Sequence, residues 1–156
     1  SDPAKVAEAE SITDALQRIA KAQVPFASRG DDSGTHRTEL RMWELAGIKP
    51  GGSWYRELGS GMGPTINTAA AMDAYVLADR ATWIAFDNRQ NLEILFEGDK
   101  ALFNQYGSVL INPERHPHLK HDLAKKWHDW LISSNGQEAI ASYKLRGQQL
   151  FFPNAE

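Results

Sequence analysis

Apolar residues recur at helical spacing along much of the chain, and short apolar runs separate these stretches. The first face, formed by Ile12, Leu16 and Ile19, follows Ser11 and Asp14, a pairing typical of a helix start. The same kind of pattern predicts six helices, over residues 11–22, 33–46, 64–73, 80–86, 119–134 and 137–145, with Asn135-Gly136 breaking the last two apart.

The short apolar runs between these helices predict strands, at residues 24–28, 54–58, 92–96 and 108–111. Residues 92–96 (LEILF) have the pattern of a buried strand, whereas residues 74–77 (AYVL) are ambiguous. Because strands alternate with helices, the sequence predicts an α/β fold rather than an all-helical one.

Composition narrows the class of protein. A chain of 156 residues with 42% hydrophobic residues can form one compact domain or a small domain with an appendage. The net charge is −3 and the 17 basic residues are scattered, so a nucleic-acid partner is not expected. The chain has no cysteine, which excludes disulfides and thiolate chemistry, and its first ten residues lack the pattern of a signal peptide, which we expect to lie outside this chain.

The stretch SRGDDSGTH, residues 28–36, combines a cation, hydroxyls and a glycine just before a predicted helix. The first amides of a helix have no intrahelical acceptor and carry a partial positive charge, which favours anions. Arg29 would add a planar fork of donors, Ser33 and Thr35 would add hydroxyls, and Gly34 would let the backbone approach a ligand. This pattern is typical of an oxyanion site.

The two aspartates in this stretch are unexpected in an anion site, because carboxylates repel anions. Asp31 or Asp32 could accept a hydrogen bond from a protonated oxyanion, or hold Arg29 in place, and Asp32 could cap the helix. A capped helix beside a surface arginine fits the spacing equally well. The RGD tripeptide is too short to indicate cell adhesion.

A second glycine-rich turn, GSGMGPT at residues 59–65, also leads into a predicted helix. It has no P-loop lysine and does not match the dinucleotide-binding pattern. Ordinary turn chemistry explains it unless the turn faces the first motif, in which case Gly61 and Met62 become weaker candidates for anion contacts.

Four histidines lie close together in the sequence, at positions 116, 118, 121 and 128. Histidines are common zinc ligands, but no HExxH motif is present, and neither a nucleophile elbow nor a convincing carboxylate pair occurs. We therefore expect no enzyme, metal site or cofactor. A histidine-dependent metalloenzyme and an interaction module built on the last helices remain the alternatives.

Several separated motifs resemble one family: SRGDDSGTH, WYRELGSGMGPTINTA, AYVLADRATW, LEILFEGD, NQYGSVLINPERHP and SNGQEAI. In this order and spacing they resemble the tungstate-binding proteins of bacterial ABC importers, from about residue 3 to 155. Residues 29–35 are also similar to the Arg-x-Asp-x-Ser-Gly-Thr pattern of phosphate-binding proteins. In phosphate-binding proteins the aspartate that matches Asp31 accepts a hydrogen bond from the protonated anion. Tungstate carries no proton at neutral pH, so here we expect Asp31 to hold Arg29 and the loop in place.

The resemblance implies one lobe of a type II periplasmic-binding-protein fold, an α/β lobe with a small mixed sheet flanked by helices, plus C-terminal helices. Residues 3–105 would form the second lobe. Residues 106–156 would supply a return crossover strand and closing helices for a first lobe, whose Thr/Ser-rich motif is absent from this chain. The apolar face bearing Trp127 and Trp130 should then pack back on the second lobe, on a second copy of the chain or on another fragment.

The resemblance also implies the function of a solute-binding component that holds a tetrahedral oxyanion between two lobes. Tungstate or molybdate is expected, with a phosphate- or sulfate-type anion as the alternative. The implied partner is a membrane permease, and the implied location is periplasmic or extracellular. The anion-binding residues would be Ser28, Arg29, Asp31, Ser33, Gly34 and Thr35.

Overall fold

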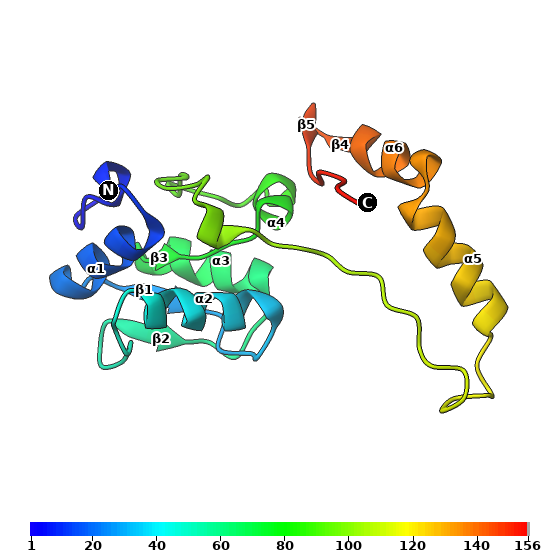
Figure 1. The fold of residues 1–156 in the computed structure, drawn as a ribbon. Helices are drawn as coiled ribbons and strands as arrows, with labels where there is room; N and C mark the ends of the chain where they lie inside the picture. The colour runs from blue at the N-terminus through cyan, green and yellow to red at the C-terminus, as the bar shows by residue number, and fades with distance from the viewer. Residues whose placement is uncertain (156) are drawn as a thin grey trace. The chain divides into compact units, whose positions relative to one another are not determined.

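The computed structural model describes residues 1–155 and divides the chain into two compact units, Ser1–Phe103 and Asn104–Glu156 (Figure 1). The elements of unit 1 are η1 (Val6–Glu8), α1 (Ile12–Ala22), β1 (Phe26–Ser28), α2 (Gly34–Leu45), β2 (Tyr55–Glu57), α3 (Met62–Met72), β3 (Tyr75–Val76), α4 (Arg80–Ala85) and η2 (Lys100–Leu102). Those of unit 2 are α5 (His121–Ile132), α6 (Ser134–Ser142), β4 (Lys144–Leu145) and β5 (Gln148–Gln149). The helices predicted from the sequence are all present.

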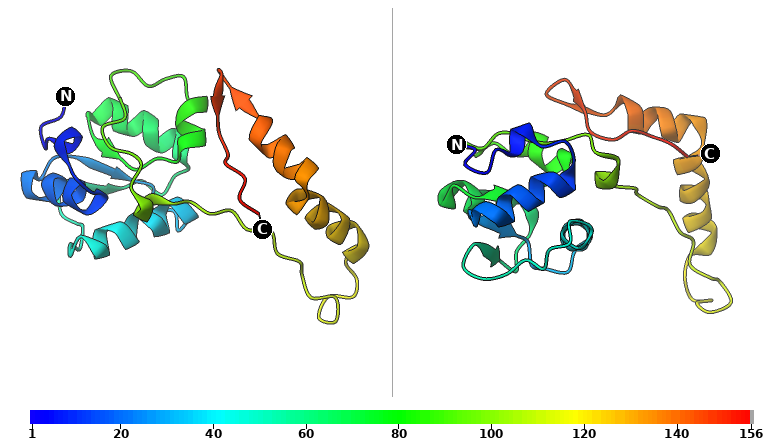
Figure 2. Two further views of the ribbon diagram at one scale, coloured as in Figure 1. Left: turned by 45° about the horizontal axis from the view of Figure 1, so that its top comes forward. Right: turned by 60° about the vertical axis from the view of Figure 1, so that its left-hand side comes forward.

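Unit 1 is built on a three-stranded parallel sheet in the order β2-β1-β3. Successive side chains of a strand point to opposite faces, so Phe26 and Ala27 of β1 enter different cores. Phe26 belongs to the cluster that contains α1 and α2, whereas Ala27 packs with Ala69 of α3. Different helices therefore cover the two faces of the sheet (Figure 2).

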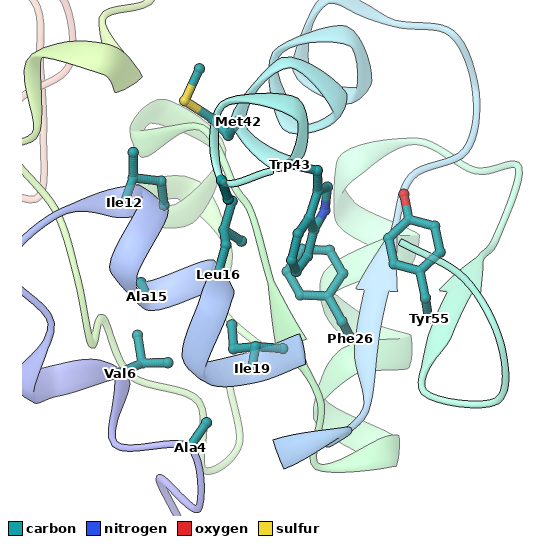
Figure 3. Close-up of a cluster of buried hydrophobic side chains, with 11 residues drawn as sticks. Ala4, Val6, Ile12, Ala15, Leu16, Ile19, Phe26, Met42, Trp43 and Tyr55 are labelled. Carbon is teal, nitrogen blue, oxygen red and sulfur yellow. The ribbon is translucent and has the colours of Figure 1, made fainter. Parts of the chain in front are cut away.

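Aromatic side chains meet aliphatic ones in the larger core (Figure 3). The Trp43 ring is fully buried and meets the Phe26 ring edge to face, with centroids 5.2 Å apart. The Tyr55 ring stacks on Phe26 at 5.8 Å. Such pairs add stability beyond the area they bury. They join α2 to both β1 and β2, and this joining positions the segment between β1 and α2.

The start of α1 follows the capping pattern read from the sequence. Ser11 Oγ accepts a hydrogen bond from the Asp14 amide at 3.1 Å, and Asp14 Oδ2 accepts one from the Glu10 amide at 3.1 Å. Asp99, far along the chain, accepts a further hydrogen bond from the Ile12 amide at 2.9 Å. This last contact ties η2 to the start of α1.

The strand predicted at residues 92–96 is wrong, because the structure assigns no strand to these residues. Leu95 and Phe96 are partly buried against the main core, and Leu92 packs on the smaller one. The apolar pattern thus indicated burial correctly, but burial does not require a hydrogen-bonded neighbour. The predicted strand at residues 108–111 forms no ladder with any strand in residues 1–155 either.

Unit 2 consists of two consecutive helices and a short antiparallel hairpin, β4–β5. Ser133 ends α5 and caps α6, since its Oγ accepts the Gly136 amide at 3.2 Å. The predicted break at Asn135-Gly136 is therefore two residues late, and both residues lie in α6. Gly136 is required there because a Cβ would collide with the Trp130 carbonyl oxygen.

The apolar face of α5 stays open in this structure. The Trp127 and Trp130 rings stack with centroids 5.1 Å apart, yet Trp127 is 60% exposed and α5 has no buried residue. The residues of unit 2 thus do not provide the covering expected for this face. Among residues 1–155, no helix has the length and apolar character that crossing a membrane would need.

Leu16→Ala is expected to lower the free energy of unfolding by about 2–5 kcal/mol, because the variant leaves a cavity in the core of unit 1. Leu16 is 4% exposed. The matched control is Leu45→Ala, which removes the same atoms from a 61% exposed side chain and should cost about 0.5 kcal/mol or less. Urea unfolding measures both, and equal losses would contradict the assigned core.

Candidate functional site

The two glycine-rich turns lie next to each other because β1 and β2 are parallel neighbours, so their carboxyl ends meet at one edge of the sheet. The Leu58 amide donates to the Ser28 carbonyl, and the Ser60 amide donates to the Arg29 carbonyl, both at 3.0 Å. The GSGMGPT turn therefore runs beside the SRGDDSGTH loop. Gly61 and Met62 therefore stay candidates for anion contacts, because the sequence made them candidates only if the two turns were neighbours.

Each turn leads into the N-terminus of a helix. Ser33 caps α2, and its Oγ accepts the His36 amide at 3.3 Å, so the amides of Gly34 and Thr35 at the first two helical positions have no intrahelical acceptor. Gly61 is the N-cap residue of α3 and has no side chain with which to cap it, and Met62, the first residue of the helix, is buried. Two helix ends with partial positive charge thus border one edge of the sheet.

Arg29 is held in place by Asp31. The Arg29 Nε and Nη2 atoms donate to Asp31 Oδ2 at 3.2 and 2.6 Å, and Nη1 lies 3.5 Å from Thr35 Oγ1. The Arg29 side chain keeps 17% of its surface exposed. The guanidinium is therefore oriented beside the start of α2, on a side chain that is not fully buried.

Both oxygens of Asp31 are already engaged. Oδ2 accepts from Arg29, and Oδ1 accepts the Ser33 amide at 3.2 Å. The hydrogen bonds from Ser33 and then from Arg29 lower the pKa of the Asp31 carboxyl to about 2. Asp31 is consequently a fixed carboxylate that supports the loop.

Asp32 does not cap the helix, since Ser33 occupies that position. Asp32 instead forms an exposed ion pair with Arg37, with Nη2 2.8 Å from Oδ2. Its backbone adopts the left-handed conformation, with φ 58°. Asp32 therefore turns the loop but faces away from the contacts made by Arg29 and Asp31.

Gly30 allows the loop to sit directly on the end of β2. Its φ of 58° is left-handed, and a Cβ at this position would lie 2.8 Å from Glu57 Cβ. Any other residue would push the loop off β2. The close approach explains why glycine follows Arg29.

A buried polar cluster lies beneath the loop. Glu39 is 2% exposed, and its Oε1 accepts hydrogen bonds from Tyr55 Oη at 2.7 Å and Trp43 Nε1 at 3.2 Å. Burial raises the pKa of the Glu39 carboxyl, and the Tyr55, Ser28 and Trp43 groups partly oppose this rise. The Ser28 hydroxyl is fully buried beside this cluster, not open to solvent, and has no partner with ordinary hydrogen-bond geometry within residues 1–155.

The structure brings together the predicted residues Ser28, Arg29, Asp31 and Ser33–Thr35 in one continuous loop and helix start. Sequence reasoning missed the roles of His36, Glu39 and Ser60. His36 and Glu39 share the buried face of α2 with Met42 and Trp43. These four residues recur at intervals of three and four, which places them on one face of a helix. A charged residue on an otherwise buried face indicates a buried hydrogen-bond network, and this was the signal in the sequence.

A family model described as "PBP superfamily domain" matches residues 1–135. The chain belongs to the PBP superfamily. It is 39% identical to the tungstate-binding protein TupA of Peptoclostridium acidaminophilum, over 99% of this chain and 56% of that protein. The TupA protein of Campylobacter jejuni is 32% identical, over 94% of this chain and 56% of the relative.

Solved structures agree with this assignment. The structure described as the tungstate ABC transporter from Geobacter sulfurreducens matches with a TM-score of 0.82 and 45% identity, over 91% of this chain and 60% of that one. The resemblance to tungstate-binding proteins and the α/β fold are thus confirmed. This PBP-superfamily chain spans about half the length of the curated relatives it matches.

The histidines of unit 2 do not assemble a metal site in this PBP-superfamily chain. His121 Nε2 lies 2.6 Å from the His116 carbonyl, whereas His128 Nδ1 pairs with Ser108 Oγ at 2.9 Å. No group of three or more His, Cys, Asp or Glu able to hold a metal ion occurs within residues 1–155. The relatives named above are described as two tungstate-binding proteins and a tungstate ABC transporter.

Arg29→Gln should raise the pKa of the Asp31 carboxyl from about 2 toward its ordinary 3.8, because one of the two groups that stabilise the carboxylate is lost. A carboxyl whose pKa is lowered by folding stabilises the fold above pH ~4 and loses this contribution as the pH falls toward 2. The variant should therefore lose it at a higher pH. Carboxyl-carbon NMR titration measures the change.

Asp99 provides the internal control for this titration. Amides of Ile12 and Ala101 lower the pKa of the Asp99 carboxyl, and neither depends on Arg29. The Asp99 pKa should stay unchanged in the variant. An Asp31 pKa that also stays unchanged would show that Arg29 does not support this carboxylate.

Proposed function

We propose that this protein is the solute-binding component of an ABC importer and that its edge-of-sheet site binds a tetrahedral oxyanion, with tungstate or molybdate as the solute. The observation that carries the proposal is the oriented guanidinium of Arg29 beside the start of α2. Arg29 Nη1 lies 3.5 Å from Thr35 Oγ1 at that helix start, and the Arg29 side chain stays partly exposed. A fixed cation next to unpaired helix amides is an arrangement suited to an oxyanion.

Each anion-binding residue has a separate role in this proposal. Arg29 neutralises charge and donates two hydrogen bonds, the amides of Gly34 and Thr35 donate along the axis of α2, and the hydroxyls of Ser33 and Thr35 donate from its first turn. The neighbouring turn adds the first amides of α3 at Gly61 and Met62. These groups are donors, as a fully deprotonated oxyanion requires.

The hydrogen bonds of Asp31 favour an oxyanion without a proton over a protonated one. A hydrogen phosphate ion needs an acceptor for its proton, and Asp31 would have to accept it in addition to the hydrogen bonds that it already receives from Arg29 and Ser33. Tungstate, molybdate and sulfate carry no proton at neutral pH and need no such acceptor. Phosphate is therefore the weaker candidate.

We further propose that residues 3–105 act as the second lobe of a two-lobed binding protein and that residues 106–156 contribute to the first. The first lobe would then supply the remaining donors from outside this chain. The chain alone should bind an oxyanion only weakly, because half of the contacts would be missing. The names of the relatives, tungstate-binding proteins and a tungstate ABC transporter, support this proposal.

The proposed partner is the membrane permease of the same importer, and the proposed place of action is outside the cytoplasmic membrane. A binding component must meet its solute before the permease moves it inward. The named relatives, which are tungstate-binding proteins and a tungstate ABC transporter, support both points.

Arg29→Gln in the whole protein should weaken tungstate binding about 10- to 100-fold, which corresponds to the roughly 1.5–3 kcal/mol of a hydrogen bond to a charged group. Arg18→Gln is the control, because Arg18 pairs with Asp14 on α1 and is expected to leave affinity unchanged. Isothermal titration calorimetry measures both variants.

The same calorimetric titrations with molybdate, sulfate and phosphate test the class of ligand. Tungstate and molybdate should bind most tightly and phosphate most weakly, since phosphate alone must donate a proton. Failure of the whole protein to bind any of the four anions would refute the proposed function. Tight phosphate binding would refute the argument based on Asp31.

A further inference from the structure

We infer that His36 is a positioning residue that holds the loop from Arg29 to Asp32 in its bent conformation, through a hydrogen bond from the Asp32 amide to His36 Nδ1. The donor and acceptor are 3.0 Å apart. His36 lies in the first turn of α2 and its side chain is only 9% exposed. The importance of this loop for an anion rests on the function proposed above.

The hydrogen bond determines the tautomer of His36. Because Nδ1 accepts the Asp32 amide proton, the neutral ring must carry its own proton on Nε2. The His36 backbone amide is separately bound by Ser33 Oγ. The residue is thus fixed to the helix through its backbone and to the loop through its ring.

The loop needs such support because two of its residues are in the left-handed region. Gly30 has φ 58° and Asp32 has φ 58°, and the second is not a glycine. A residue with a side chain adopts this conformation only when its surroundings hold it there. These two turns set where Arg29 and Asp31 point, so a support for the Asp32 amide also orients the guanidinium.

The other nitrogen of His36 identifies the competing explanation. Nε2 is buried, has no hydrogen-bond partner within residues 1–155, and lies 3.9 Å from Glu57 Oε1 at the end of β2. If His36 acted through Nε2, it would do so by contacting Glu57 or the ligand rather than Asp32. The two explanations can be distinguished by substitutions whose polar group replaces either Nδ1 or Nε2 but not both.

His36→Asn and His36→Gln form the matched pair. The Asn side chain places an acceptor oxygen at the same bond distance from Cβ as Nδ1, whereas the Gln side chain places its terminal group at the distance of Nε2 and is closer to His in volume. His36→Ala removes both. His36→Asn should keep the hydrogen bond to the Asp32 amide, and His36→Gln and His36→Ala should lose it.

The first measurement is hydrogen exchange of the Asp32 amide by NMR, without any anion. Exchange should stay near the wild-type rate in His36→Asn and become about tenfold faster in His36→Gln and His36→Ala, as the loss of one partly buried hydrogen bond predicts. Thermal unfolding of each variant checks that the fold is retained. Unchanged exchange in His36→Ala, or protection by Gln but not by Asn, would overturn the inference.

The second measurement is tungstate affinity by calorimetry on the whole protein. The His36→Gln and His36→Ala variants should bind tungstate about tenfold more weakly, whereas the His36→Asn variant should bind it as the wild type does. If the wild type binds tungstate and all three variants bind equally well, the inference is overturned. If the wild type does not bind at all, the proposed function fails, and the exchange measurement still decides the role of His36.

Discussion

The parallel pairing of β1 with β2 is the constraint on which the site depends. It brings the carboxyl ends of two strands together, and each strand continues through a short glycine-rich turn into a helix. Backbone hydrogen bonds from Leu58 and Ser60 then tie one turn to the other. Two helix N-termini and one arginine converge because of this pairing, although they lie some thirty residues apart in the sequence.

The carboxylates near the site are paired with hydrogen-bond donors of the protein. Asp31 takes up part of the charge of Arg29 and orients it, while its oxygens are turned toward Arg29 and Ser33. Glu39 lies deeper, under Ser28, where Tyr55 and Trp43 donate to it. The donors at the edge of the sheet are the Arg29 guanidinium, first-turn amides and hydroxyls, so two aspartates in this loop are compatible with the anion site proposed above.

Sequence patterns predicted the helices well and the strands unevenly. Ser11, Ser33 and Asp79 each cap a helix, a local effect that a few neighbouring residues determine. The apolar run at residues 92–96 is irregular, because apolar residues need burial and can obtain it without a partner strand. The apolar residues of α5 and of residues 108–111 also predict burial. Among the described residues of unit 2, α5 has no buried residue and residues 108–111 pair with no strand.

The amino-acid sequence by itself determined the helix starts, the α/β class and the loop that carries Arg29, Asp31 and Ser33–Thr35, because these depend on residues close together along the chain. Only the tertiary structure decided that the GSGMGPT turn lies beside this loop, that Gly30 rests on Glu57, and that Glu39 of α2 accepts a hydrogen bond from Tyr55 of β2. These relations depend on strand order and on the packing of α2 against β1 and β2. Contacts between residues distant in the sequence leave no local pattern from which to read them.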